Sequence, residues 1–399
     1  MNILFLSLSR FDDVQTRGIY SDLMREFITR GNEVFIASPT ERRYKKKTYL
    51  IKQSHCQILK IRTLNIQKTN VIEKGIGTLL LEGQFDRAIR KYWNDIRFDL
   101  VLYATPPITL NRVIERVKSR CGCRSYLMLK DIFPQNAVDM SMIKSDGLLH
   151  LLFRRKEKRL YEISDRIGCM SPANCEYIIK HNPSVNPEKV ELCPNAIMPV
   201  KRSELNEQDR SEQCIRYGLP IDKTLYIYGG NLGKPQGIDF LIKVLEANEK
   251  RTDSFVIVAG NGTEYPKIEQ WFRKNAPTAS KLFAALPKNE YDNLICLCHV
   301  GLIFLDPRFT IPNFPSRLLS YLENSMPVLL ATDPATDMGR IAEREGFGLW
   351  SISGDLDKWK ENMNLMTPET IRTMGSCGKR FLMQNYVVDK IADIILNLI

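Results

Sequence analysis

The chain has 399 residues, of which 44% are hydrophobic and 26% are charged. This length exceeds what one hydrophobic core usually supports, and this composition excludes an intrinsically disordered or a collagen-like chain. The formal net charge of +11 favours an anionic partner without saying which one.

Further classes of protein are excluded by what the sequence lacks. No apolar run reaches the roughly 18 residues needed to cross a bilayer, and the apolar start at residues 1–8 is too short for a secretory leader. The ten cysteines are scattered, and neither their two C-x-C pairs nor the four histidines have the spacing of a zinc site. We therefore expect no metal site and a reducing, cytoplasmic location.

The first half of the sequence alternates short apolar runs with amphipathic stretches, which is typical of a doubly wound parallel sheet. Apolar residues recur at helical spacing from Ile19 to Ile28, and Gly31 ends that helix. The expected strands cover residues 2–8, 33–38, 57–62, 99–103, 124–129, 166–170 and 190–193, and the expected helices cover 19–30, 71–94, 109–119 and 149–163.

The second half repeats this alternation after a polar segment, residues 201–212, that we expect to be a linker. The expected strands cover residues 224–229, 254–259, 301–305 and 327–331, and the expected helices cover 237–248, 316–324 and the region from 368 to the end. The pattern predicts an α/β protein of two Rossmann-like lobes facing a cleft. Residues 1–200 form the first lobe, 201–375 the second, and 376–399 a helix that returns to the first.

Basic residues gather in two segments. Residues 40–70 contain nine Lys and Arg against the single Glu41, and a second cluster at residues 154–159 follows the apolar residues 148–153. Basic residues beside apolar ones suit an anionic membrane surface or a diphosphate-linked lipid, and solvated loop and helix faces are the alternative. No nucleic-acid-binding motif accompanies the charge, so we expect no nucleic acid as a partner.

Three motifs carry a resemblance to a known family. They are Asp131-Ile132-Phe133-Pro134, the segment from Gly229 to Gly237, and the segment from Phe314 to Leu322, with Cys193-Pro194-Asn195 before the second half. In this order the residues resemble the GT-B fold glycosyltransferases of family 4, near the subgroup that adds amino-deoxy sugars in O-antigen and capsule assembly. The resemblance implies a retaining enzyme that needs no metal and uses a nucleotide sugar as co-substrate.

The first donor-binding segment runs from Gly229 to Gly237. It follows an expected strand and precedes a helix, so its amides are placed to face a phosphate, and Gly230 allows close approach. The family has an Arg and a Lys here, whereas this chain has Asn231 and Gln236. Lys234 is our candidate for the missing positive charge, and a glycine turn needed only for packing is the alternative.

The second donor-binding segment begins the expected helix after Pro315. We expect Asn313 to cap this helix, free amides near Ser316 and Leu318 to hold a phosphate, and Arg317 to help the nucleoside diphosphate depart. The family places two Glu in this segment, where this chain has Pro312 and Ser320. We expect Ser320, or Glu323 one turn later, to meet the ribose; an exposed Arg at a helix start is the alternative for Arg317.

Four more residues complete the predicted site. By resemblance, Leu286 lies in the loop that meets the base, and Gly262 belongs to a second glycine turn near the donor. In the first half, Arg17 and Gly18 follow the first strand, where a turn can approach an acceptor diphosphate.

Asp131 is expected to serve as the base, because it stands at a strand's carboxyl end and a carboxylate of suitable pKa can accept the proton of the acceptor hydroxyl. A plain turn former is the alternative for this residue.

The predicted function is transfer of a sugar from a nucleoside diphosphate, with UDP preferred, to an undecaprenyl-diphosphate-linked acceptor at the inner face of the plasma membrane. Three alternatives remain. A sugar-nucleotide epimerase shares the fold, a non-catalytic partner subunit would explain the substituted family residues, and a nicotinamide dehydrogenase would require a G-x-G-x-x-G segment that is absent after the first strand.

Overall fold

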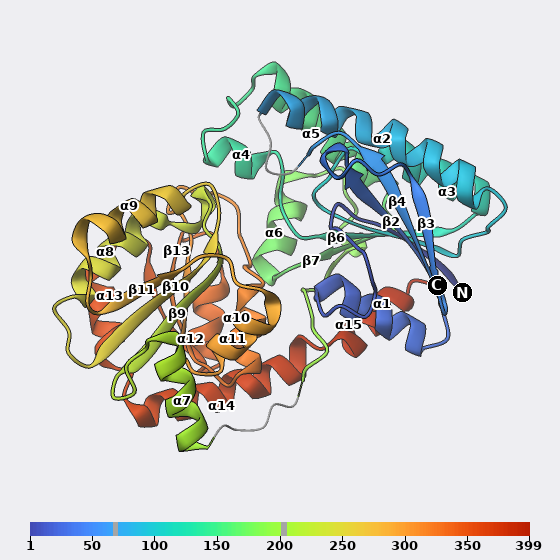
Figure 1. Ribbon diagram of the computed structural model, residues 1–399. Coiled ribbons are helices and arrows are strands. Elements are labelled where there is room, and N and C mark those ends of the chain that lie inside the picture. Colours follow the sequence, from blue (N-terminus) through green and yellow to red (C-terminus); the bar gives the residue numbers. More distant parts are fainter. Residues whose placement is uncertain (67–70, 201–205) are drawn as a thin grey trace. The chain divides into compact units, whose positions relative to one another are not determined.

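A computed structural model describes residues 1–66, 71–200 and 206–399, apart from the side chains of 71, 72 and 74. The chain divides into two units: unit 1 comprises Met1–Met198 and Val387–Ile399, and unit 2 comprises Pro199–Tyr386 (Figure 1). Lys68 of the basic segment and residues 201–205 of the expected linker lie outside the described residues.

Unit 1 is built on an eight-stranded sheet in the order β3-β4-β2-β1-β5-β6-β7-β8. All neighbouring strands are parallel except β3, which pairs antiparallel with β4 and was not expected from the charged sequence around it. The strands are β1 (Asn2–Leu6), β2 (Glu33–Glu41), β3 (Tyr49–Gln53), β4 (Cys56–Thr63), β5 (Leu100–Ala104), β6 (Arg124–Leu129), β7 (Arg166–Cys169) and β8 (Val190–Leu192).

Helices cover both faces of this sheet (Figure 1). The helices α2, α3 and α5 lie on one face, and α1 and α15 pack together on the other. The helices of unit 1 are α1 (Ile19–Thr29), α2 (Val71–Trp93), α3 (Asn111–Cys121), α4 (Gln135–Asp139), α5 (Leu148–Ile163), α6 (Pro172–His181) and α15 (Val388–Leu396).

The C-terminal region is divided between the two units. Ile391 and Ile395 of α15 are buried in the core of unit 1, as expected for a helix that returns to the first lobe. The preceding helix, α14 (Pro368–Asn385), contacts α11 and belongs to unit 2, because Gly378 packs against Leu322 of α11. The returning segment is therefore shorter than residues 376–399.

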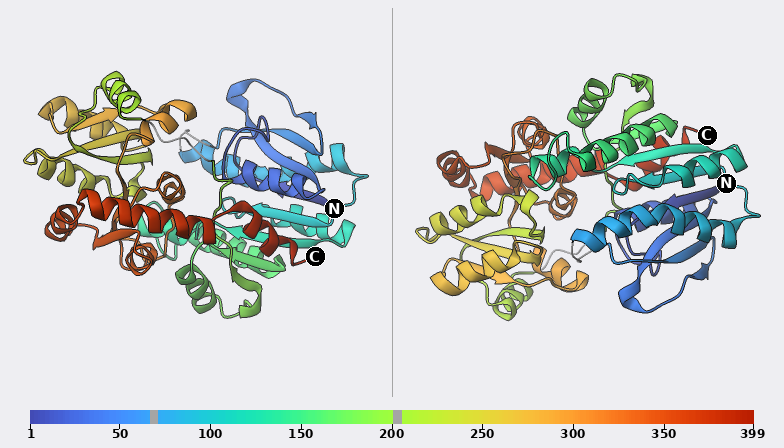
Figure 2. Two further views of the ribbon diagram at one scale, coloured as in Figure 1. Left: turned by 90° about the horizontal axis from the view of Figure 1, so that it is seen from below. Right: turned by 90° about the horizontal axis from the view of Figure 1, so that it is seen from above.

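Unit 2 contains a six-stranded parallel sheet in the order β11-β10-β9-β12-β13-β14. Its strands are β9 (Thr224–Asn231), β10 (Ser254–Asn261), β11 (Ser280–Phe283), β12 (Val300–Phe304), β13 (Val328–Thr332) and β14 (Gly348–Ile352). Its other helices are α7 (Glu207–Tyr217), α8 (Ile238–Asn248), α9 (Tyr265–Asn275), α10 (Lys288–Ile295), α11 (Arg317–Glu323), α12 (Met338–Arg344) and α13 (Leu356–Asn364), and they cover both faces of the sheet (Figure 2).

The second part of the expected linker is helical. Asn206 caps α7 by accepting a hydrogen bond from the amide of Asp209, and Cys214 and Tyr217 of α7 are buried within unit 2. The polarity of residues 206–212 therefore reflects the solvated side of a short amphipathic helix, and the expectation of a linker over these residues was wrong.

Among the parallel strands of each sheet the strand order reverses at one place, between β1 and β5 in unit 1 and between β9 and β12 in unit 2. Open α/β sheets bind ligands beside the carboxyl ends of strands at such a reversal. The motifs quoted above follow β1, β6 and β9 or begin α11, so the topology places them at these edges.

Candidate functional site

The glycine segment of unit 2 is formed by two strand ends that lie side by side. Gly230 pairs with Gly260 and Asn231 pairs with Asn261. A side chain at Gly260 would come within 1.9 Å of the Gly230 carbonyl oxygen, and one at Gly262 would come within 2.3 Å of the Leu232 backbone. Close backbone packing thus explains Gly262, and the same packing holds the turn at Gly230, whose φ is +120°.

Arg317 lies beside this turn. Its Cζ is 4.3 Å from the ring centroid of Tyr228 and 3.9 Å from the position of a Cβ on Gly230. Nη2 donates a hydrogen bond to Oε1 of Gln236, whereas Nη1 is buried and has no hydrogen-bond partner among the residues that the structure describes. A guanidinium fixed by a ring and an amide, with one buried N–H edge left unpaired, is suited to bind an anionic oxygen.

The other residues of the predicted segment are placed differently. Asn231 and Lys234 are exposed, and Gln236 is half-buried. The Tyr228 hydroxyl donates a hydrogen bond to the Asn231 carbonyl oxygen at 2.7 Å, and this contact stabilises the turn. The structure therefore brings Gly230, Gln236 and Arg317 together, with Lys234 exposed on the adjoining turn Lys234–Gln236.

Two tyrosines that the sequence did not single out support the same turn. The Tyr321 hydroxyl of α11 accepts a hydrogen bond from the Gly229 amide at 3.1 Å and donates to the Ile227 carbonyl oxygen. A side chain at Gly229 would collide with the Tyr291 hydroxyl of α10. Leu286 is half-buried and lies just before α10. The loop predicted to contact the nucleotide base therefore leads into a helix that contacts the glycine turn.

The start of α11 differs from the prediction. Ser316 is the N-cap residue and makes no side-chain cap bond, so Asn313 is not the cap. The amide of Leu318 donates to the Pro315 carbonyl oxygen at 3.2 Å, and its side chain is fully buried. Because this tight turn occupies the Leu318 amide, Leu318 is not available to a phosphate, and the expectation of a free amide there was wrong.

Asn313 has another role in unit 2. Its amide N–H donates to Oγ1 of Thr336 at 3.0 Å, and Thr336 in turn donates to the buried carboxylate of Asp333 at 2.9 Å. Burial raises the pKa of Asp333 to about 6. This chain of contacts fixes the loop that leads from β12 to Arg317.

The two candidates for ribose binding have different surroundings. Ser320 is half-buried on α11, and its carbonyl oxygen accepts from the Asn324 side chain. Glu323 is buried, and its Oε1 accepts a hydrogen bond from the Val200 amide at 2.9 Å. One oxygen of Glu323 is therefore already used within unit 2.

In unit 1, Asp131 stands directly beyond the carboxyl end of β6. Its Oδ2 accepts a hydrogen bond from the Asn136 side chain at 2.7 Å, and Oγ1 of Thr105 holds its backbone amide and carbonyl. Burial raises the pKa of Asp131 to about 6, although the Asn136 contact acts in the opposite direction. A half-buried carboxylate with this pKa suits a general base near neutral pH.

Lys130 is a neighbour of Asp131 that the sequence did not single out as a site residue. Its Nζ donates to the Cys193 carbonyl oxygen at 3.0 Å, and burial lowers its pKa to about 8. Lys130 thereby ties the end of β6 to the segment Cys193-Pro194-Asn195.

The turn at Arg17 and Gly18 does not have the expected chemistry. The Gly18 amide donates to Oδ1 of the buried Asp22 at 3.1 Å, and Oδ2 of Asp22 accepts from the Met198 amide. A carboxylate thus occupies the place where an acceptor phosphate was predicted, and Arg17 contacts the Met198 carbonyl oxygen. The prediction of a phosphate at Gly18 is wrong for this arrangement, because Asp22 already holds its amide.

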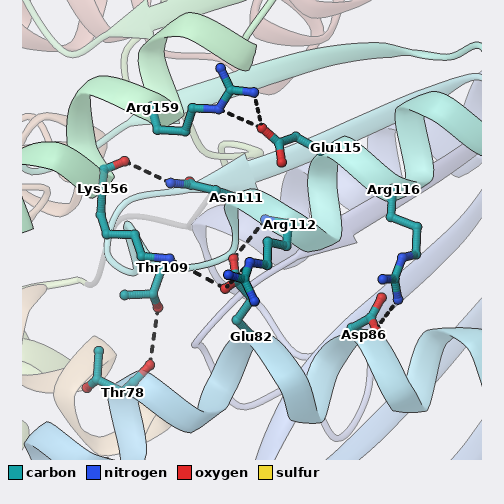
Figure 3. A network of polar contacts seen from close by, with 10 residues as sticks. All are labelled: Thr78, Glu82, Asp86, Thr109, Asn111, Arg112, Glu115, Arg116, Lys156 and Arg159. Carbon is teal, nitrogen blue, oxygen red and sulfur yellow. Dashed lines mark hydrogen bonds and ion pairs between the residues drawn. The ribbon is translucent and has the colours of Figure 1, made fainter.

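A polar network holds three helices on one face of unit 1 (Figure 3). Glu82 of α2 accepts from the Arg112 amide at the start of α3 and pairs with Lys156 of α5 at 3.5 Å. Arg159 of α5 pairs with Glu115 of α3. In the described part of the chain, Arg155 and Lys158 of α5 have no acidic partner, and both are exposed.

The amino-terminal parts of α2 and α5, beyond this network, expose large apolar side chains. On α5 the exposed fractions of Leu148 and Leu149 are 88% and 59%. Among the described residues, this apolar surface consists of Ile76, Leu79 and Leu80 of α2 and Leu148, Leu149, Leu151 and Leu152 of α5. None of the helices in the described ranges has the length and apolar character needed to cross a membrane.

Comparisons with known proteins bear on this arrangement. No family model matches the chain. The sequence is 22% identical over 298 residues to the probable glycosyltransferase WbjE of Pseudomonas aeruginosa. The aligned region covers 73% of this chain and 71% of the relative. That similarity spans both units.

Solved structures resemble the whole chain. Sucrose-phosphate synthase of Thermosynechococcus elongatus has a TM-score of 0.76 at 14% identity and covers 100% of this chain and 98% of its own. Anabaena HepE in complex with UDP has a TM-score of 0.68 at 14% identity, covering 100% and 99%. WaaG, a glycosyltransferase involved in lipopolysaccharide biosynthesis, has a TM-score of 0.67 at 14% identity, covering 98% and 99%.

The chain has the fold of the GT-B glycosyltransferases. This confirms the fold class predicted from the motifs, and the relationship to WbjE supports a glycosyltransferase. Membership of family 4 and a preference for amino sugars remain predictions.

Proposed function

We propose that this protein transfers a sugar from a nucleoside diphosphate, UDP by preference, to a lipid-diphosphate-linked saccharide, with retention of the anomeric configuration. The observation that carries the proposal is the Arg317 guanidinium beside Gly230, whose buried Nη1 has no partner in the described part of the chain. The structure of HepE with UDP supports the choice of nucleotide.

The proposed chemistry divides between the units. In unit 2, Arg317 stabilises the negative charge that develops on the diphosphate as the glycosidic bond breaks, and Lys234 adds charge from the adjoining turn. Ser320 is the better candidate for the ribose because Glu323 already holds the Val200 amide. In unit 1, Asp131 accepts the proton of the acceptor hydroxyl.

A thermal-shift screen with UDP, GDP, ADP, CMP and NAD tests the donor. A nucleotide at about 100 times its Kd adds roughly 2.7 kcal/mol to the free energy of unfolding, so a bound nucleotide is readily seen. We expect UDP to raise the Tm and NAD to leave it unchanged, and EDTA to affect neither UDP binding nor turnover. GDP alone would change the donor and keep the reaction class.

The same screen separates the alternatives. A protein that no nucleotide stabilises would be a non-catalytic partner subunit, and the transferase would be wrong. An epimerase would consume a UDP-sugar without any acceptor and release a second UDP-sugar, which chromatography distinguishes from transfer.

We further propose that the apolar surface of α2 and α5 attaches the protein to the inner face of the plasma membrane. Leucines that are half or more exposed lie next to Arg155 and Lys158, whose charges have no acidic partner in the described residues. Exposed apolar side chains together with cations on one helix match a bilayer that carries anionic lipids. Such attachment would bring the protein to a lipid-linked acceptor.

The variant Leu149→Glu/Leu151→Glu tests this attachment by cosedimentation with phosphatidylglycerol-containing vesicles. We expect at least about a tenfold loss of binding, because two apolar side chains no longer enter the bilayer. The matched control is Ile215→Glu/Leu365→Glu, which changes two exposed apolar residues of unit 2. Equal sedimentation of the two variants would contradict the proposed surface.

A further inference from the structure

A separate pocket of about 180 Å³ lies in unit 1, where β1 and β2 end. Its walls come from the loop after β1, the last residues of β2 and the segment up to the start of β3. The lining residues are Arg10, Asp12, Pro39, Thr40, Tyr44, Lys46 and Tyr49. None of them belongs to the site described above.

The pocket has an excess of positive charge. Asp12 is its one lining carboxylate, and it already pairs with Arg10 at 2.5 Å and with the buried Lys60 at 3.0 Å. Asp12 thus balances one of two adjacent cations, and Lys46 adds a third that has no acidic partner in the described residues. Burial lowers the pKa of Lys60, and the positive charges of Arg10 and Lys46 act in the same direction.

Aromatic rings hold two of these cations in place. Cζ of Arg10 is 4.7 Å from the ring centroid of Tyr44, and Nζ of Lys46 is 5.6 Å from that of Tyr49. Cation–π contacts of this kind restrict long side chains that would otherwise be mobile. The cations are therefore positioned before any ligand arrives.

Thr40 provides independent evidence for a ligand. It lines the pocket and is only 5% exposed, yet its Oγ1 has no hydrogen-bond partner within residues 1–66, 71–200 and 206–399. A buried hydroxyl without a partner costs free energy, and such groups normally bond to protein, water or ligand. A ligand oxygen inside the pocket would satisfy Thr40.

We propose that this pocket binds a carboxylate- or phosphate-bearing sugar of the acceptor. The anionic group follows from the pocket itself, whereas its attachment to a sugar rests on the proposed function. The volume is below the roughly 300 Å³ of ordinary cofactor and drug sites, so it suits one sugar ring or its charged substituent and not a nucleotide. The substrate class is thus an acidic rather than a neutral acceptor.

Calorimetric titration of the full-length protein tests the pocket with four probes: glucuronate, glucose 6-phosphate, inorganic phosphate and glucose. We expect the two anionic sugars to bind more tightly than inorganic phosphate, and glucose to bind least. Inorganic phosphate that binds as tightly as the sugars would overturn the proposal, because the pocket would then recognise a bare anion. Failure of both anionic sugars to bind would overturn it as well.

Two variants locate the binding. Thr40→Val keeps the shape of the side chain and removes a hydroxyl that has no partner among the described residues. It should therefore not lower the Tm, and it should raise the Kd about five- to tenfold. Lys46→Gln should raise the Kd about tenfold, whereas Lys47→Gln, the neighbouring cation that does not line the pocket, serves as the control. If Thr40→Val and Lys46→Gln bound the anionic sugars as tightly as Lys47→Gln does, the pocket assignment would be wrong.

UDP binding, measured on the same samples, separates this proposal from the proposed function. Both pocket variants should bind UDP like the unchanged protein. If the unchanged protein binds UDP but does not bind the anionic sugars, only the proposal for the pocket is wrong. An unchanged protein that binds the anionic sugars but no nucleotide overturns the transferase and, with it, the role of the pocket in holding an acceptor.

Discussion

Arg317→Ala is expected to lower kcat/KM by about 10² to 10³ while leaving the fold intact. Removing one preorganised donor to developing negative charge has an effect of this size. The variant loses the cation–π contact with Tyr228 and one hydrogen bond to Gln236, whose Oε1 keeps the Tyr228 hydroxyl as a donor at 3.4 Å. The Tm should therefore fall only slightly. Turnover of UDP-sugar and the Kd for UDP, each measured with purified protein, check this expectation.

Matched variants make the Arg317 test specific. Arg273→Ala removes an exposed arginine of α9 whose partner is Glu269, and it should leave turnover unchanged. Arg317→Lys keeps the positive charge but loses the planar guanidinium group with its paired N–H donors, so it should retain only part of the activity of the unchanged protein. Turnover of Arg317→Ala within a factor of about two of the unchanged protein would remove Arg317 from the mechanism.

Asp131→Asn is expected to lower kcat by about 10² to 10⁴, the range that general-base catalysis contributes. The pKa of Asp131 is raised to about 6. The unchanged enzyme should therefore lose activity as the pH falls below about 6, because the carboxyl group is then protonated and cannot accept a proton. A pH profile from 5 to 9 measures both the loss and its midpoint.

The same substitution, Asp131→Asn, lowers kcat but is expected to increase the free energy of unfolding at pH 8. The native state holds the Asp131 proton more tightly than the unfolded chain, whose carboxyl pKa lies near 3.8. The free energy of unfolding therefore falls as the pH rises from about 4 to about 6, by up to about 3 kcal/mol. Asp131→Asn removes this penalty and should be the more stable protein at pH 8.

A control distinguishes this effect from a general change of charge. Asp146→Asn alters an exposed carboxylate of unit 1 and should leave kcat unchanged. An Asp131→Asn variant that keeps more than about a tenth of the activity would show that another group accepts the proton.

The sequence by itself determined the two α/β series and most of their strands. Alternation of apolar runs with 3.6-residue periodicity depends on local spacing, so β6, β9 and β10 and the helices α1 and α8 could be predicted within a few residues. The same local reasoning failed for β3, where Lys and Arg hide a strand that is stabilised by its pairing with β4. It also failed for residues 206–212, whose polarity suited a helix face as well as a linker.

The contacts within the site were decided only by the tertiary structure. Gln236 and Arg317 are 81 positions apart, and Tyr291 of α10 and Tyr321 of α11 reach the glycine turn from other elements. The sequence identified Arg317 as a cation but contained no sign that its Nη1 would be buried and unpaired. Likewise, Asp22 holds the Gly18 amide four residues away because α1 turns its carboxylate back onto the start of the helix. Spacing along the chain predicts elements, whereas the partner of each polar group depends on which strand ends the sheet brings together.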